Sequence, residues 1–134
     1  MNISRNIITQ FLLEHIPHLQ GIYLFGSYAQ NMADKKSDVD IAVLTPAKLS
    51  LAEKNETAFL LSKRLNVSQV DLIDLKTAST VLQEEILYTG ERIATQDEMA
   101  CEKYEDYMAR KALDFAIFCR PLVEDILARK SVYG

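Results

Sequence analysis

The sequence predicts an α/β (α+β) fold: a small mixed sheet of three to four strands, flanked by helices and followed by a long C-terminal helical segment. Short apolar runs of β-forming residues predict the strands, and apolar residues spaced three and four apart predict the helices. Of the 134 residues, 49% are apolar and 25% are charged, which suits one compact domain. We expect a single domain over residues 1–134, with a core over residues 1–96 and a helical extension over residues 97–134.

Three clear strands and one weaker strand are expected. Residues 21–25 form an apolar run that ends at a Gly-Ser turn, and residues 70–75 form a second aliphatic run. Residues 38–44 alternate with period two, which is the repeat of a strand whose two faces differ. Residues 92–95 are expected to add a short strand at the sheet edge.

Helical spacing indicates helices over residues 4–16, 49–65 and 78–88, and a short helix over residues 28–33. Ser4 is the expected N-cap of the first helix, because its hydroxyl can accept a hydrogen bond from a free N–H group of the first turn. The expected core residues of the 49–65 helix include Leu51, Ala58, Leu61 and Leu65.

The segment from residue 97 to about residue 129 is predicted to form one long helix, or two divided by a kink at Pro121. Its apolar stripe consists of Tyr104, Tyr107, Met108, Ala112, Phe115, Cys119, Leu122 and Ile126. Two interpretations stay open. The stripe packs on the core, or part of it (Phe115, Phe118, Leu122 and Ile126) forms an exposed patch that marks an interface.

Composition narrows the functional classes. The net charge of -4 does not favour direct binding to DNA or RNA, which usually requires a basic face. Cys101 and Cys119 are ~27 Å apart on a straight helix at roughly 1.5 Å per residue, so they cannot form a disulfide there. Free thiols, no signal-peptide pattern and no long apolar run predict a cytoplasmic protein without a membrane span.

The most informative stretch begins with Gly26 and Ser27 at the end of the first strand. Glycine allows a sharp turn and a close approach to a ligand, because it has no Cβ. Ser27 is expected to begin a helix, whose free N–H groups and partial positive charge attract phosphate. We therefore expect this turn to hold the β- and γ-phosphates of a nucleoside triphosphate.

Asp38 and Asp40 are two residues apart on a strand, so their carboxylates point to the same side. Two adjacent carboxylates repel each other unless a cation lies between them, and Mg²⁺ prefers oxygen ligands of this kind. A third carboxylate from a neighbouring strand would complete the cluster. Asp71 is the best candidate, while Asp74 is ranked second because alternation directs it to the other face.

A Gly-Ser turn or an Asp-x-Asp pair alone is weak evidence, since either occurs by chance at strand ends. The joint order of strand, Gly-Ser, helix, loop, Asp-x-Asp and a further Asp favours a nucleotide site. With ten residues between Ser27 and Asp38, this pattern resembles the DNA polymerase β-type nucleotidyltransferase superfamily. The short length resembles its minimal nucleotidyltransferase (MNT) group, the antitoxins of HEPN/MNT toxin–antitoxin pairs.

The resemblance implies the nucleotidyltransferase fold and Mg²⁺-dependent transfer of AMP from ATP to a tyrosine hydroxyl of a HEPN ribonuclease toxin, which silences the toxin. It implies that Asp38, Asp40 and Asp71 are catalytic metal ligands and that Asp71 also acts as the base for the attacking hydroxyl. Gly26 and Ser27 would bind the triphosphate. The partners implied are therefore the HEPN toxin and ATP.

The sequence departs from many relatives of this group directly after the Gly-Ser turn. Gln30 stands where an arginine is usual, and Asn31 stands where a glycine is usual. Asn tolerates a left-handed backbone, so the turn can survive, but losing the arginine removes a phosphate contact. Lys35 or Lys36 could replace that contact.

Two other functions compete with the adenylyltransferase. In the first, the chain neutralises a toxin by binding alone, through the C-terminal helix, as a weak or inactive MNT domain. In the second, it modifies a small molecule such as an aminoglycoside, although relatives of that kind generally carry a larger second domain than 134 residues allow.

Overall fold

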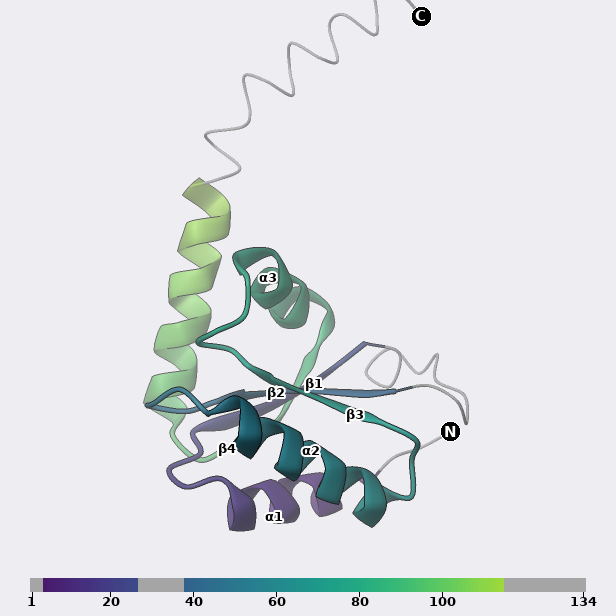
Figure 1. Ribbon diagram of the computed structural model, residues 1–134. Coiled ribbons are helices and arrows are strands. Elements are labelled where there is room, and N and C mark those ends of the chain that lie inside the picture. The colour runs from purple at the N-terminus through teal and green to yellow at the C-terminus, as the bar shows by residue number, and fades with distance from the viewer. Residues whose placement is uncertain (1–3, 27–37, 115–134) are drawn as a thin grey trace, which may run out of the picture.

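The computed structural model describes residues 4–26 and 38–114, which form a four-stranded mixed sheet with helices on both faces (Figure 1). A further helix over residues 98–114 follows the last strand. This architecture confirms the predicted fold class. The other elements are, in chain order, α1 (Arg5–His15), β1 (Gly21–Phe25), β2 (Val39–Leu44), α2 (Leu51–Leu65), β3 (Val70–Asp74), α3 (Thr80–Thr89) and β4 (Glu91–Thr95).

The strands lie in the order β3-β2-β1-β4, so the weakly predicted strand β4 is indeed at an edge. β1 is antiparallel to both β2 and β4, whereas β2 and β3 are parallel. α2 makes the crossover that a parallel pair requires. As a result, the end of β1 lies beside the beginning of β2, and β3 begins at the same side of the sheet.

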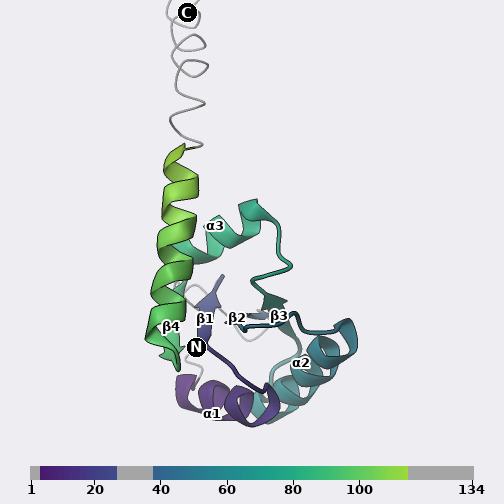
Figure 2. The ribbon, with the colours of Figure 1, turned by 90° about the vertical axis from the view of Figure 1, so that its left-hand side faces the viewer.

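The two faces of the sheet carry separate apolar clusters. Helices α1 and α2 cover one face, where Ile41 of β2 is fully buried with Ile8 and Leu61. Helix α3 and the helix over residues 98–114 cover the other face, where Tyr23 is buried with Ile86 (Figure 2). Because side chains alternate along a strand, the odd-numbered residues of β2 fill the first cluster and the even-numbered residues, Asp40 included, face the α3 side.

Serine N-caps begin α1, α2 and α3. Ser4, Ser50 and Ser79 each accept a hydrogen bond from the backbone N–H three residues later. The prediction of Ser4 as a cap is therefore confirmed. α2 ends at Asn66, whose left-handed φ of 56° is tolerated by asparagine.

The prediction that Leu51 is a core residue is wrong. Its side chain is 69% exposed, because Leu51 is the first residue of α2 and projects from the helix end rather than toward the sheet. The other expected core residues of this helix do pack inward. Leu61 is fully buried, and Ala58 and Leu65 pack against the same cluster.

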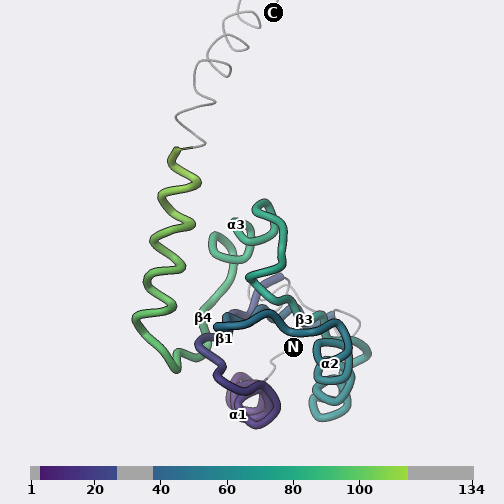
Figure 3. The backbone as a smooth tube through the Cα atoms, turned by 60° about the vertical axis from the view of Figure 1, so that its left-hand side comes forward, coloured from purple at the N-terminus to yellow at the C-terminus, as the bar shows by residue number. Residues whose placement is uncertain are grey.

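The helix over residues 98–114 confirms the described part of the predicted extension, and Figure 3 shows it running past α3 and away from the sheet. The predicted helix over residues 28–33, Pro121 and the stripe from Phe115 onward lie outside the described residues. Met108 of the stripe is buried, whereas Tyr107 is 61% exposed. None of the helices in the described ranges is long and apolar enough to cross a membrane.

Polar contacts fix this helix to the core. The Tyr23 hydroxyl donates to Glu105 Oε1 at 3.0 Å, and Arg92 Nη1 donates to Glu105 Oε2 at 3.3 Å. Tyr104 donates to Gln83 of α3 at 2.6 Å. Because Tyr23 is only 2% exposed, its hydroxyl depends on Glu105 for a partner.

We predict that Glu105→Ala lowers the free energy of unfolding by about 1–3 kcal/mol, because it leaves a buried hydroxyl without an acceptor. Thermal or urea unfolding followed by circular dichroism measures the loss. Glu102→Ala, on the exposed side of the same helix, is the matched control and should change stability by less than about 0.5 kcal/mol. Equal losses in both variants would contradict the proposed role of the Tyr23–Glu105 contact.

Candidate active site

Asp40 and Asp71 lie side by side on neighbouring parallel strands. The register pairs Asp40 of β2 with Asp71 of β3, and adjacent strands are about 4.8 Å apart. Both side chains are partly buried on the α3 side of the sheet. Asp38 lies just before β2 and is exposed. The structure thus brings together Asp40 and Asp71, which the sequence places 31 residues apart.

The turn after β1 lies against Asp40. Gly26 has a φ of +72°, in the left-handed region that favours glycine, and a Cβ built on it would be 2.2 Å from Asp40 Oδ2. A larger residue at position 26 would therefore both strain the backbone and displace the carboxylate. Ser27, Gln30, Asn31 and the lysines at 35 and 36 lie outside the described residues.

The pKa of Asp40 is raised to about 6. Burial is the main cause, followed by the charge of Asp71 and a side-chain hydrogen bond with it, and then by the charges of Asp38 and Glu85. Burial and the neighbouring negative charges thus disfavour the ionised form of Asp40. A bound cation would oppose this effect.

Two side chains beside the carboxylates were not found from the sequence. Gln69 Nε2 donates to Asp71 Oδ1 at 3.1 Å. Its position two residues before Asp71 was the available signal, because such residues share a strand face. Glu85 comes from α3, and nothing in the sequence pattern connects it with Asp40.

Asp74 belongs to the scaffold rather than to this pair. It is 1% exposed, and its two oxygens accept the backbone N–H groups of Leu49 at 2.9 Å and Lys76 at 3.0 Å. These bonds tie the end of β3 to the chain that leads into α2. The ranking of Asp71 above Asp74 therefore agrees with the geometry.

The carboxylate pair has the right chemistry for Mg²⁺, which binds carboxylate oxygens together with substrate phosphates and water. The fit rests on the pairing of Asp40 and Asp71, where burial and the neighbouring charge both raise the Asp40 pKa. In the described part of the chain, no three His, Cys, Asp or Glu side chains are gathered as a metal site, so the structure does not bring Asp38 together with this pair as a three-carboxylate cluster.

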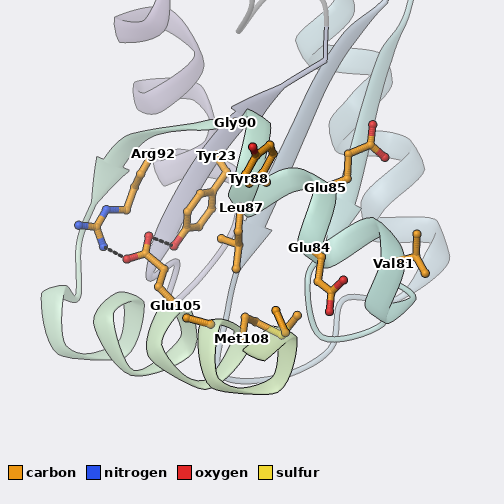
Figure 4. Close-up of a pocket in the computed structure, with 12 residues that line it drawn as sticks. Tyr23, Val81, Glu84, Glu85, Leu87, Tyr88, Gly90, Arg92, Glu105 and Met108 are labelled. Atoms are coloured by element: carbon orange, nitrogen blue, oxygen red, sulfur yellow. Dashed lines mark hydrogen bonds and ion pairs between the residues drawn. The ribbon is translucent and has the colours of Figure 1, made fainter. Parts of the chain in front are cut away.

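A pocket of about 650 Å³ opens between α3 and the helix over residues 98–114 (Figure 4). Its floor is Tyr23, held by Glu105 and Arg92, and its walls are mainly apolar, with Glu84 and Glu85 on the α3 side. Gly90 in its lining lies beside β1, since a Cβ there would be 3.2 Å from Phe25 Cβ. The sequence analysis did not predict this pocket.

These features agree with the comparison with known families. The family model described as polymerase beta, nucleotidyltransferase, matches residues 6–99. The chain belongs to the polymerase beta nucleotidyltransferase family. The matched range includes Gly26, Asp38, Asp40 and Asp71, so the predicted resemblance is confirmed at the level of the family.

Within the family, the chain is 43% identical over 91 residues to the protein adenylyltransferase MntA of Shewanella oneidensis. That match covers 68% of this chain and 65% of the relative, which is slightly less than two thirds of the relative's length. The similarity therefore applies to the 91 shared residues.

Two solved structures are similar over almost the whole chain. A crystal structure of a toxin–antitoxin with AMP-PNP contains a chain that is 33% identical, with a TM-score of 0.79, and covers 93% of this chain and 99% of that chain. A chain in the structure of a tri-AMPylated HEPN toxin of Shewanella oneidensis in complex with an MNT antitoxin is 32% identical, with a TM-score of 0.71. This match covers 92% of the present chain and 95% of that chain.

We predict that Asp40→Asn stabilises the metal-free protein at neutral pH. The folded-state pKa of Asp40 is raised, so the carboxyl group contributes fully to folding stability below about pH 4. This contribution is lost as the pH rises through about 6. The gain is about 1 kcal/mol at pH 7 after allowing for partial exposure, or a Tm increase of about 4 °C. Melting curves in chelator at pH 4 and pH 7 test this. A gain that is equal at both pH values would contradict it.

Asp74→Ala should have the opposite effect on stability. It removes the acceptor for two backbone N–H groups in a buried position, at a cost of about 2–4 kcal/mol at neutral pH. Urea unfolding measures this loss, and Asp97→Ala, which removes an exposed helix cap, is a useful comparison expected to cost only ~1 kcal/mol. A near-neutral Asp74→Ala would show that water replaces the carboxylate.

Proposed function

We propose that this protein is a Mg²⁺-dependent protein adenylyltransferase that transfers AMP from ATP to a tyrosine hydroxyl of a cognate HEPN ribonuclease toxin and so acts as its antitoxin. The observation that carries the proposal is the pairing of Asp40 with Asp71 directly beside the Gly26 turn. The similarity to a protein adenylyltransferase supports the choice of a protein acceptor.

Each residue has a distinct role in this proposal. Gly26 and Ser27 bind the triphosphate, and Asp38, Asp40 and Asp71 hold Mg²⁺. When bound, Mg²⁺ supplies positive charge that offsets the negative charge of the phosphates. Asp71 also acts as the base, because it lies at the outer side of the pair, where an incoming hydroxyl can reach it.

At the α-phosphorus the reaction forms one bond and breaks one, and a proton is transferred alongside. The tyrosine oxygen attacks the α-phosphorus of ATP, and the bond from that phosphorus to the bridging oxygen of pyrophosphate breaks. The hydroxyl proton passes to Asp71. Gln69 Nε2 donates to Asp71 Oδ1 at 3.1 Å, which orients the carboxylate that accepts that proton.

The neighbours support this assignment. The toxin–antitoxin structures include one with AMP-PNP, one with an AMPylated HEPN toxin and an MNT antitoxin, and one in which two aspartates, two positions apart, are changed to glutamate. Asp38 and Asp40 have the same spacing. We also propose a cytoplasmic location. The reaction uses ATP, and the free thiol of the buried Cys101 is typical of a reducing compartment.

A second candidate function is neutralisation of the toxin by binding alone. It is favoured by exposed apolar side chains on the helix over residues 98–114, where Met99 is 65% and Leu113 is 60% exposed. In this case the chain would protect cells without chemistry, and the carboxylates would be dispensable.

We expect co-expression with the wild-type chain to add one or more AMP units to the HEPN partner, as measured by intact mass. Asp38→Asn combined with Asp40→Asn should abolish the added mass, because it removes the charges that hold the metal. The charge-matched control is Glu102→Gln combined with Asp106→Asn on the exposed side of the C-terminal helix, which should leave the added mass unchanged.

The two candidate functions give different results in this experiment. If the double-asparagine variant still modifies the partner, the assigned site is wrong. If the wild-type chain protects cells, the partner carries no AMP, and the double-asparagine variant protects equally well, binding alone is the function.

A further inference from the structure

We propose that the protein partner docks along the outer edge of β3 and the adjoining side of α2, so that its hydroxyl enters the site across Asp71. This surface, here called the β3-edge surface, is formed by Asn55, Phe59, Ser62, Ser68, Gln69 and Asp71. The inference rests on the proposed function, and it names the direction and surface by which the acceptor arrives.

The sheet order sets this direction. Gly26 follows β1, Asp40 lies on β2 and Asp71 lies on β3, so the three parts of the site follow the strand order across the sheet. In phosphoryl transfer, the attacking and leaving oxygens are roughly in line on opposite sides of the phosphorus. Because the pyrophosphate is held at the Gly26 turn, the attacking oxygen must come from the β3 side.

The β3 side offers a shaped surface for the acceptor segment. A pocket of about 300 Å³ lies between α2 and β3 and includes Asp71 in its lining. The Asp71 side chain faces the α3 side of the sheet and α2 covers the opposite side, so this pocket meets the candidate base around the outer edge of β3. The larger pocket between α3 and the helix over residues 98–114 is lined by Glu85, which also approaches Asp40, but it does not include Asp71. Only the β3-edge pocket of the two includes the candidate base.

The backbone of β3 can bind an extended segment. The bonds from Val39 N–H to Gln69 O and from Leu75 N–H to Val43 O show that odd-numbered residues of this strand pair with β2. By alternation, the N–H and C=O groups of Val70 and Leu72 point outward. In the described part of the sheet, β3 has no neighbour on that side, so these groups can pair with an added strand.

Helix α2 supplies an apolar anchor beside this edge. Phe59 is 60% exposed and lines the pocket, and Leu60 next to it is 39% exposed. Lys63 Nζ lies 5.2 Å from the centre of the Phe59 ring. The surface therefore fits an extended segment of the HEPN partner that carries the acceptor hydroxyl and an apolar side chain close to it.

Phe59→Glu tests the proposal, and the chain contains a closely matched control. Tyr107 on the C-terminal helix is 61% exposed, and Lys111 lies over its ring at 5.8 Å, with the same four-residue spacing as Phe59 and Lys63. In both variants the new glutamate precedes a lysine by four residues, which favours the helix. Both should fold, as circular dichroism will verify.

The measurement is AMP incorporation into the purified HEPN partner at increasing partner concentrations, with AMP-PNP binding measured in parallel. For Phe59→Glu we expect KM for the partner to rise at least about tenfold, as for an interface anchor, with kcat little changed. AMP-PNP affinity should equal that of the wild type. Tyr107→Glu should match the wild type in all three quantities.

The results separate the two proposals. If the wild-type chain transfers no AMP, the proposed function fails, whatever the variants do. If the wild type transfers AMP and Phe59→Glu has an unchanged KM for the partner, the β3-edge surface is not the docking site. A KM increase in Tyr107→Glu alone would instead place the partner on the C-terminal helix and overturn the proposal.

Discussion

The repulsion between two carboxylates on neighbouring strands is the constraint on which the rest of this structure depends. Asp40 and Asp71 are paired in register, and the pKa of Asp40 is raised to about 6 by burial and by the charge of its neighbour. Such a pair is unfavourable in a folded protein unless something else compensates for it. Its presence beside a left-handed glycine is the observation on which the proposed cation and phosphate site rests.

The compensation comes from the opposite face of the same strands. Val39, Ile41 and Val43 of β2 are fully buried in the cluster that α1 and α2 cover, so the strand that carries Asp40 is held by its opposite face. Asp74 adds two hydrogen bonds that fix the end of β3. Asp71 and Asp74 lie on the same strand but face opposite sides of the sheet. Asp71 lies beside the like charge of Asp40, whereas Asp74 accepts hydrogen bonds from two backbone N–H groups.

Much of this arrangement could be predicted from local sequence patterns. Period two placed Asp38 and Asp40 on one side of a strand and separated Asp71 from Asp74, because the alternation of side chains is a property of the strand itself. The Ser4 cap could also be predicted, because its hydroxyl bonds to the first turn of its own helix and does not depend on distant packing. The expectation that Leu51 is buried failed because helical spacing does not show which residues of the first turn face the sheet.

Features that depend on how distant segments pack could not be predicted. The register that pairs Asp40 with Asp71 is set by how β2 and β3 pack together, and neither strand encodes it alone. Glu85 approaches Asp40 only because α3 folds back over that face of the sheet. The pocket above Tyr23 likewise exists only when the C-terminal helix is held by Glu105.

The same constraint links stability with binding. In the metal-free protein, burial and neighbouring charges oppose ionisation of Asp40 at neutral pH, and a cation that binds only the folded state would stabilise that state by mass action. In the proposed reaction, the strand order β3-β2-β1 would give the two substrates separate routes, with phosphate at the β1 turn and the acceptor at the β3 edge. The pairing of Asp40 on a middle strand with Asp71 on an edge strand is what would connect the two routes.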